Sequence, residues 1–333
     1  MPQADEPVTS RKAECSLGVG PAPATPPPDR GHIATEQRNP ASMALHGLSA
    51  GGCIDLILAE DLAVMAALQA ARGQLAALVE AIEPKFTHPQ SAGRLIYLGA
   101  GTSGRLGVLD ASETPPTFCV GTDRIIGIIA GGDSALRKSS EGMEDDPRGA
   151  MGELRALGLN DRDSVLAIAA GGTTPYAVGG LEVAKHLAPG CLTGLLTCSP
   201  VAKPPHCDHL IVLQTGPEVL TGSTRMKAGS ATKMALNAIS TSLMVRSGRV
   251  YQNLMVDLRA TNAKLRDRGA RVIATVTGLG RDESLALLDR AGGRAKLAIA
   301  MHKLGLDADS AQLKLDTVRG RLGDLLDRVT PGG

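Results

Sequence analysis

The stretch LGAGTSGRLGVLDASETPP, residues 98–116, decides how this chain folds. It contains Gly99, Gly101 and Gly104 in the spacing G-x-G-x-x-G, directly after the apolar run RLIYL. An apolar strand, a glycine-rich turn and a helix in this order are typical of a parallel α/β sheet in which the helix amino end faces an anion. The sequence predicts a strand over 94–99 and a helix over 103–113, ended by the two prolines that follow.

Further apolar runs repeat this alternation of strand and helix along the chain. Strands are predicted over 125–132, 164–170, 191–198 and 209–214, with helical patterns between the first three. Strands that alternate with helices indicate a parallel sheet covered on both faces, which binds ligands beyond the carboxyl ends of its strands. A helical pattern over 53–82 precedes the sheet. Long helices over 223–247 and 254–268 follow it, and then come short helices broken by glycines.

Three regions differ in composition. Residues 1–33 are rich in proline and poor in large apolar side chains, so we expect a disordered extension. Residues 34–270 carry the sheet and its helices, and 271–333 are expected to form a small helical domain.

Composition excludes several classes of function. The net charge is only +1 and aromatic residues make up 2% of the chain, so neither bulk electrostatics nor base stacking favours nucleic acid. No apolar run approaches the length of a membrane span, and the first residues lack a signal peptide's apolar centre, which predicts a cytoplasmic protein. The six cysteines form no C-x-x-C pair, and the run His206-Cys207-Asp208-His209 lacks zinc-ligand spacing, so no metal is expected.

The first loop could hold a dinucleotide or a smaller phosphate. Asp133, after the second predicted strand, is a candidate for the ribose contact of a dinucleotide. Two further loops favour the smaller ligand, because AAGGTTPYAVGG and TGSTRMKAG each place hydroxyls before a helix start. Helix capping alone explains any one of the three loops, but three together suit a sugar phosphate better. The candidate phosphate-binding residues are Thr102, Ser103, Gly104, Gly172, Thr173, Thr174, Ser223 and Lys227.

Two carboxylates near these loops are candidates for acid–base chemistry. Glu113 lies about two and a half turns into the first predicted helix, and Glu144 lies in SSEGMEDDP after the second strand. Acid runs before helices are commonly solvated caps. Paired carboxylates beside a phosphate cradle are also what proton transfer on a sugar requires.

Several long blocks of the sequence closely resemble one family. LGAGTSGRLGVLDASETPPTF, SSEGMEDD, GPEVLTGSTRMKAGSATKMALNAIST and NLMVDLRATNAKLRDR are similar to blocks of the N-acetylmuramic acid 6-phosphate etherases, as is TEQRNPAS near Thr35. The similarity extends over essentially everything after the proline-rich extension. One loop departs from it, because the family usually has A-S-G-R-T-P where this chain has AGGTTP, residues 170–175.

The resemblance implies a flavodoxin-like SIS (sugar isomerase) fold, a homodimer with its site near the interface, and no metal or cofactor. It implies a carbon–oxygen lyase that cleaves the D-lactyl ether of N-acetylmuramic acid 6-phosphate to N-acetylglucosamine 6-phosphate and D-lactate, in recycling of cell-wall amino sugars. Glu113 matches the family's proton donor and Glu144 its second acid–base residue. An aldose–ketose isomerase, which needs no donor for lactate, and a non-catalytic sugar-phosphate sensor are the alternatives.

Overall fold

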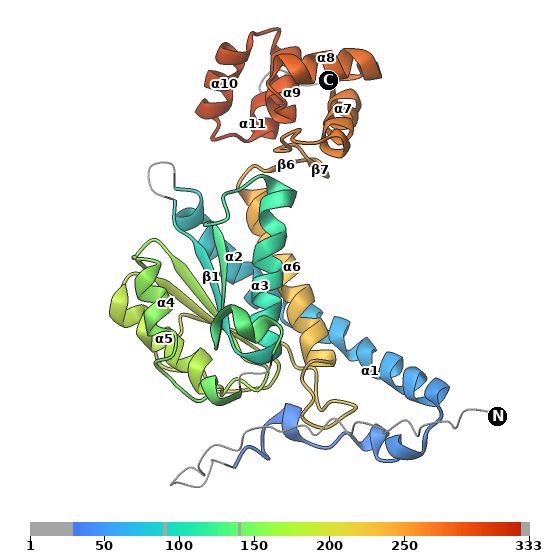
Figure 1. The fold of residues 1–333 in the computed structure, drawn as a ribbon, viewed down its shortest axis with the longest axis vertical. Coiled ribbons are helices and arrows are strands. Elements are labelled where there is room, and N and C mark those ends of the chain that lie inside the picture. Colours follow the sequence, from blue (N-terminus) through green and yellow to red (C-terminus); the bar gives the residue numbers. More distant parts are fainter. Residues whose placement is uncertain (1–28, 89–91, 139–140, 328–333) are drawn as a thin grey trace, which may run out of the picture. The chain divides into compact units, whose positions relative to one another are not determined.

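The computed structural model describes residues 29–88, 92–138 and 141–327 (Figure 1). The chain divides after Arg30, and the fold described below is the second unit, Gly31–Gly333. Most of the predicted extension, residues 1–28, lies outside the described residues. Its expected end near residue 33 stays a prediction, although Ile33 itself is only 5% exposed and lies in the second unit.

A parallel sheet of five strands forms the centre of this unit. Its order is β2-β1-β3-β4-β5, and β1 pairs along its whole length with β2 on one side and β3 on the other. This is the strand order of flavodoxin-like folds, so the predicted fold class is confirmed. The strands are β1 (Leu95–Gly99), β2 (Ile125–Ile129), β3 (Ser164–Ile168), β4 (Leu192–Thr197) and β5 (His209–Val212).

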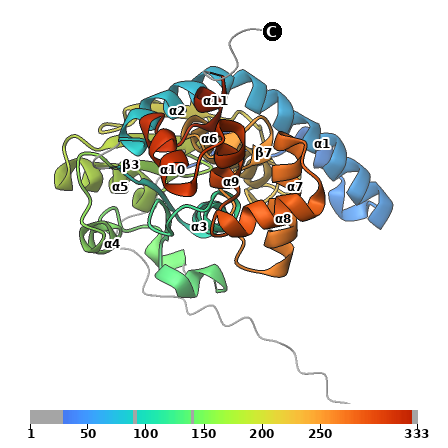
Figure 2. The same ribbon diagram turned by 90° about the horizontal axis from the view of Figure 1, so that it is seen from above.

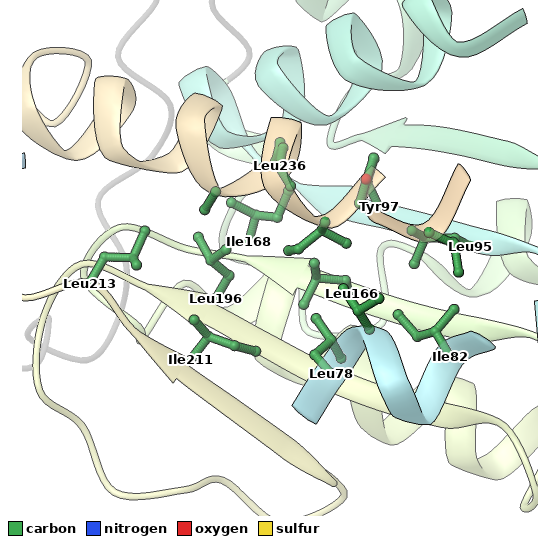
Figure 3. Close-up of a cluster of buried hydrophobic side chains, with 14 of the residues drawn as sticks. Leu78, Ile82, Leu95, Tyr97, Leu166, Ile168, Leu196, Ile211, Leu213 and Leu236 are labelled. Atoms are coloured by element: carbon green, nitrogen blue, oxygen red, sulfur yellow. The ribbon is translucent and has the colours of Figure 1, made fainter. Parts of the chain in front are cut away.

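Both faces of the sheet are covered, as the alternating side chains of its strands require. Tyr97 and Leu166 point into a cluster with α1, α2, α3 and α6 (Figure 3), whereas Leu98 and Val165 point into a second cluster with α4 and α5. The covering helices are α1 (Ala50–Ala70), α2 (Arg72–Phe86), α3 (Gly101–Phe118), α4 (Met151–Ala156), α5 (Pro175–Leu187) and α6 (Lys227–Arg246).

Short 3-10 turns occur in two places. Three of them, η1 (Ala34–Glu36), η2 (Pro40–Ser42) and η3 (Leu45–Gly47), precede α1, whose first turn is capped by the Ser49 hydroxyl. The helical pattern over 53–82 is divided at Ala71 into α1 and α2. After β2, the turns η4 (Gly132–Leu136) and η5 (Glu141–Met143) precede α4.

The prediction that two prolines end the first helix is wrong, because α3 continues through Pro115 and Pro116 to Phe118. Pro115 cannot donate the amide hydrogen bond that the carbonyl of Ala111 would otherwise accept. The buried hydroxyl of Thr114 donates to that carbonyl instead, at 2.9 Å. The helix ends at Cys119, which adopts the left-handed conformation with φ +52°.

The chain after α6 forms a helical tail with its own core around Val256, Ile273, Leu288 and Ile299. The helix predicted over 254–268 is wrong in its first part, because β6 (Val250–Tyr251) and β7 (Leu254–Met255) form a hairpin and the helix begins after the Asn262 cap. The helices α7, α8, α10 and α11 pack around α9 (Figure 2). Their bounds are α7 (Ala263–Thr277), α8 (Arg281–Arg290), α9 (Ala295–Leu304), α10 (Ala308–Thr317) and α11 (Leu322–Leu326).

The helical appendage expected at the carboxyl end is therefore present. The expected boundary at residue 270 falls inside α7, and the separation of 271–333 as a domain stays a prediction. Within the described ranges, no helix is both long enough and apolar enough to cross a membrane.

Candidate active site

The first loop is formed by backbone at the junction of β1 and α3. Gly101 opens the helix with φ +52°, and the amides of Gly101, Thr102 and Ser103 donate no hydrogen bond within the part of the chain that the structure describes. Gly104 has to be glycine, because a Cβ there would stand 2.6 Å from both the carbonyl oxygen of Gly99 and Cγ1 of Ile129. Free amides at the positive end of a helix of this length form an anion site.

Glu144 lies at this same helix end. Its carboxylate Oε1 is 3.1 Å from the position that a Cβ on Gly101 would occupy. Its carbonyl oxygen accepts a hydrogen bond of 3.0 Å from the amide of Tyr176, in the first turn of α5. The structure therefore brings Glu144 to Thr102, Ser103 and Gly104, the first group of predicted phosphate-binding residues.

The second loop follows β3 and contains a required glycine. Gly172 has φ +75°, and a Cβ there would lie 2.7 Å from Val201 and 2.9 Å from the Thr197 hydroxyl. Thr173 is exposed, and Thr174 is the N-cap of α5 without a side-chain cap bond. At Gly171, where the family usually has serine, a Cβ would meet its neighbours at 3.5 Å or more. The backbone of this chain therefore accommodates the family's residue.

The third loop leads into α6, which begins at Lys227 and not at Ser223 as predicted, so Ser223 lies in the preceding turn. The carboxylate of Glu218 is fully buried and accepts from the amides of Lys227 at 3.0 Å and Ala228 at 2.9 Å. Burial raises the pKa of Glu218, and the two amide hydrogen bonds oppose that rise. Glu218 therefore caps α6, a role that was the alternative explanation for the hydroxyls of this loop.

Lys227 is paired inside the chain. Its ammonium lies 2.6 Å from Oε2 of Glu60 on α1, and its side chain is only 3% exposed. Asn39 donates to the same carboxylate oxygen at 2.6 Å. The hydrogen bond from Lys227 holds the pKa of Glu60 below its usual value. The predicted role of Lys227 toward substrate stays a prediction, and the structure adds an ion pair that connects the third loop to α1.

The segment before α1 contacts the second and third loops, and the hydroxyl of Thr35 lies 3.7 Å from a Cβ position on Gly171 of the second. The amide of Thr35 donates to the hydroxyl of Ser199, just after β4, at 3.3 Å, and both residues are fully buried. Carboxylate Oε2 of Glu36 lies 3.1 Å from a Cβ position on Gly222, in the third loop. Local sequence does not predict roles for Thr35, Ser199, Glu60 and Glu218, because their partners lie 9 to 167 residues away in the chain. The TEQRNPAS block was the one signal that pointed to the first of these.

The predicted loops therefore gather where expected, at the carboxyl edge of the sheet. The methyl group of Thr102 lies 3.7 Å from a Cβ position on Gly229 of α6, so the first and third loops are adjacent. We call this group of residues the sheet-edge site: Thr102, Ser103, Gly104, Glu144, Gly172, Thr173, Thr174, Ser223 and Lys227.

Glu113 is not part of the sheet-edge site of its own chain. It is exposed on α3, twelve residues after Gly101, which places it about 18 Å along the helix axis from the amino end. It borders a cavity of about 400 Å³ between α3 and α6, which Asp110, Lys233 and Asn237 also line. Within one chain, the two predicted catalytic carboxylates are therefore too far apart to act on one sugar.

A buried polar network forms the wall of this cavity. The hydroxyl of Tyr97 donates to Asp110 at 3.0 Å, and the ammonium of Lys233 contacts the other carboxylate oxygen at 3.0 Å. Burial raises the pKa of Tyr97 well above its usual value, and the charge of Asp110 adds to the effect. Asp110 is one turn before Glu113 on α3, so the network fixes the helix that carries Glu113. Among the residues described, no cluster of three or more His, Cys, Asp or Glu side chains could hold a metal ion.

A family model described as the N-terminal SIS domain of glucokinase regulatory protein matches residues 77–185, which contain the first two loops and Glu144. The structure is also similar to that of a putative sugar-phosphate isomerase from Listeria monocytogenes. That similarity has a TM-score of 0.40 and 16% identity, and it covers 60% of this chain and 92% of the other. The fold assignment rests on the strand order given above.

Curated relatives define the family more narrowly. N-acetylmuramic acid 6-phosphate etherase of Prochlorococcus marinus (strain MIT 9303) is 50% identical over 289 residues, covering 86% of this chain and 90% of the relative. The Gloeobacter violaceus protein of the same name is 46% identical over 304 residues, covering 91% and 98%. The chain belongs to the N-acetylmuramic acid 6-phosphate etherase family, and the resemblance seen in the sequence is confirmed.

Proposed function

We propose that this protein cleaves the D-lactyl ether of N-acetylmuramic acid 6-phosphate, giving N-acetylglucosamine 6-phosphate and D-lactate in the cytoplasm. The observation that carries the proposal is identity of 46–50% to proteins of that name over nearly the whole chain. The geometry at the amino end of α3 supports it, because a phosphate site and a carboxylate stand side by side there.

The phosphate of the substrate binds to the free amides of α3 and to the hydroxyls of Thr102 and Ser103, with the second loop as its other wall. Glu144 then faces the sugar chain beyond the phosphate. In the ring-opened sugar, the aldehyde makes the proton on carbon 2 acidic, and the carboxylate of Glu144 removes it. A positioned base of this kind typically contributes about 10²–10⁴-fold to the rate.

Loss of that proton breaks the bond between carbon 3 and the lactyl oxygen. A carboxylic acid gives its proton to the departing lactate, and this is the role we assign to Glu113. Water then adds across the double bond between carbons 2 and 3, returning a hydroxyl to carbon 3 and a proton to carbon 2. Substrate and one water thus account for both products, without a metal or cofactor in any step.

Because Glu113 lies about 18 Å from the amino end of α3 in its own chain, the acid has to come from a second copy. We propose a homodimer in which Glu113 of one chain faces Glu144 of the other. A two-fold axis would then form two identical sites, each with one carboxylate from each chain.

An exposed apolar stripe on α1 supports this dimer. Ile54, Leu58, Leu62 and Met65 recur at helical spacing and are all exposed, Leu62 to 77%. An apolar cavity of about 600 Å³ lies between α2 and α6, bordered by Leu75, Val79 and Met234 among others. A contiguous apolar face of this kind is typical of an interaction surface. A second copy would cover it and bring Glu113 to the partner's sheet-edge site.

The test is release of D-lactate from N-acetylmuramic acid 6-phosphate by the wild type, Glu113→Gln, Glu144→Gln and the control Glu153→Gln, an exposed acid on α4. We expect both site variants to lose at least 100-fold in rate while the control stays within two-fold. Glu113→Gln should still exchange the carbon-2 proton with solvent, because Glu144 remains. Isomerisation of a hexosamine phosphate without lactate release would instead indicate the isomerase, and ligand-induced stabilisation without turnover would indicate the sensor.

The origin of the acid has its own test. Glu113→Gln and Glu144→Gln chains, unfolded together and refolded in equal amounts, would form mixed dimers in which one site has both carboxylates and the other has neither. We expect activity to recover to about a quarter of wild type, since half of the dimers are mixed under two-fold symmetry. No recovery, with mixed dimers verified by mass, would place both carboxylates in the same chain and contradict the proposal.

A further inference from the structure

A second cavity lies at the opposite end of α3, and all of its lining except Cys119 comes from the chain after α6. It has a volume of about 410 Å³, within the range of small-molecule sites, and Cys119, the C-cap of α3, borders it. Four cationic side chains and one anionic one line it: Arg249, Arg259, Arg294, Lys296 and Asp257. We call this cavity the tail pocket.

The floor of the tail pocket is neutral. Lys296 is 9% exposed, and its ammonium donates to the carbonyls of Gly248 at 3.0 Å and Gly320 at 2.8 Å and pairs with Asp257 at 2.7 Å. These three contacts use its three donors. Burial lowers the pKa of Lys296, which the contact with Asp257 opposes. Lys296 and Asp257 therefore neutralise one another and build the site without leaving charge for a ligand.

The three arginines leave donors unused. Arg249 offers one nitrogen, Nη1, to Asp257 at 3.0 Å. Arg294 uses Nε and Nη1 on the carbonyl of Ala291 and on Gln312. The carbonyl of Arg259 accepts from the amide of Thr261 at 2.9 Å, but its guanidinium makes no hydrogen bond or ion pair among the residues that the structure describes. Each guanidinium carries five donors, so the pocket presents several N–H groups and a net charge of +3 from its lining.

Two of these arginines stand directly opposite one another. Arg259 and Arg294 form an isolated antiparallel bridge, so their side chains leave the same face with Cβ atoms about 5 Å apart. Like charges in such a pair destabilise the fold unless an anion lies between them. The amide of Leu297, in the first turn of α9, also donates no hydrogen bond within the described ranges, and it lies at the positive end of that helix.

We infer that the tail pocket binds a phosphate monoester of a small polar molecule, with its phosphate held between Arg259, Arg294 and Arg249. Planar guanidinium groups bind phosphate through paired N–H donors, and two opposed arginines form a clamp for its oxygens. Gln312 also borders the pocket, and its amide keeps one oxygen lone pair and one hydrogen after its bonds to Arg294 and Asp316, which suit the hydroxyls of a polar remainder. The site is separate from the sheet-edge site and does not depend on the etherase proposal.

Calorimetric titration with glucose 6-phosphate tests the site. It is carried out on the full chain with Thr102→Ala and Ser103→Ala, so that binding at the sheet-edge site is suppressed. Into this background we introduce Arg259→Gln with Arg294→Gln. The matched control is Arg290→Gln with Lys303→Gln, which removes the same charge from exposed positions of the tail outside the pocket.

We expect the pocket variant to bind glucose 6-phosphate at least ten-fold more weakly than the background protein, while the control stays within two-fold. Inorganic phosphate should bind more weakly than glucose 6-phosphate to the background protein. Unchanged binding in the pocket variant would overturn the site. An equal loss of affinity in the control variant would also overturn it, because the loss would then follow from removing positive charge anywhere on the tail. Equal affinity for inorganic phosphate would overturn the assignment to a monoester. Far-ultraviolet circular dichroism of each variant verifies that the tail is folded.

Discussion

The two ends of α3 carry two sites that are built in different ways. At the amino end, glycines and main-chain amides form the sheet-edge site, and Gly104 and Gly172 leave no room for a side chain. At the carboxyl end, long cationic side chains form the tail pocket, over a floor made by Lys296 and Asp257. A backbone site depends on close packing, whereas a side-chain site depends on charge balance. The two should therefore respond to different perturbations.

The largest effect is expected from the floor of the tail pocket. Lys296→Met leaves Asp257 and the carbonyls of Gly248 and Gly320 without their buried partner. Breaking a buried pair in this way costs about 3–5 kcal/mol of unfolding free energy. Urea denaturation measures the loss. The control Lys303→Met, at an exposed position on α9, should change stability by less than about 0.5 kcal/mol. A loss of similar size in both would mean that the paired floor has no special role.

Close packing at the other end of α3 gives the next effect. Gly104→Ala places a methyl group 2.6 Å from the Gly99 carbonyl, so β1 and α3 have to separate. We expect a loss of about 3 kcal/mol, because an overpacked backbone contact cannot relax by rotamer change. Gly73→Ala, in α2, has nothing within 4 Å and should raise stability by about 0.5–1 kcal/mol through helix propensity. The contrast fails if both substitutions shift the urea midpoint in the same direction.

The smallest effect depends on pH and concerns the ion pair that attaches α1 to the sheet-edge site. The lowered pKa of Glu60 means that its contribution to stability is complete above the pKa of the unfolded chain and is lost as pH falls through the folded-state pKa. Glu60→Gln should cost about 1–2 kcal/mol at pH 7. The difference in unfolding free energy between Glu60→Gln and wild type, measured by urea denaturation, should shrink as the solution is acidified below about pH 4. A difference that is constant from pH 7 to pH 3 would show that Glu60 acts through packing alone.

Local sequence predicted much of the sheet, because each strand is an apolar run next to a glycine-rich turn. It predicted the first loop and the start of α5 for the same reason. It failed at Pro115, where the Thr114 hydroxyl replaces a missing donor, and at 254–268, where a hairpin uses residues with a helical pattern. In both places a contact that the pattern does not contain outweighs local preference.

The candidate site divides in the same way. The hydroxyls of the first loop and Glu144 follow from motifs in the sequence. The buried cap Glu218, the pair of Glu60 with Lys227, and the contact of Thr35 with Ser199 join distant residues and have no local signature.

The sequence by itself determined the fold class, the family and the identity of the two candidate carboxylates, because these depend on residue types in short, ordered blocks. Only the tertiary structure decided that Glu144 stands at the amino end of α3 and so away from Glu113 of the same chain, because Glu144 comes from a segment that follows β2. Only the tertiary structure opposed Arg259 to Arg294, which are 35 residues apart in the chain. Distances between segments depend on packing, and a single sequence does not record them.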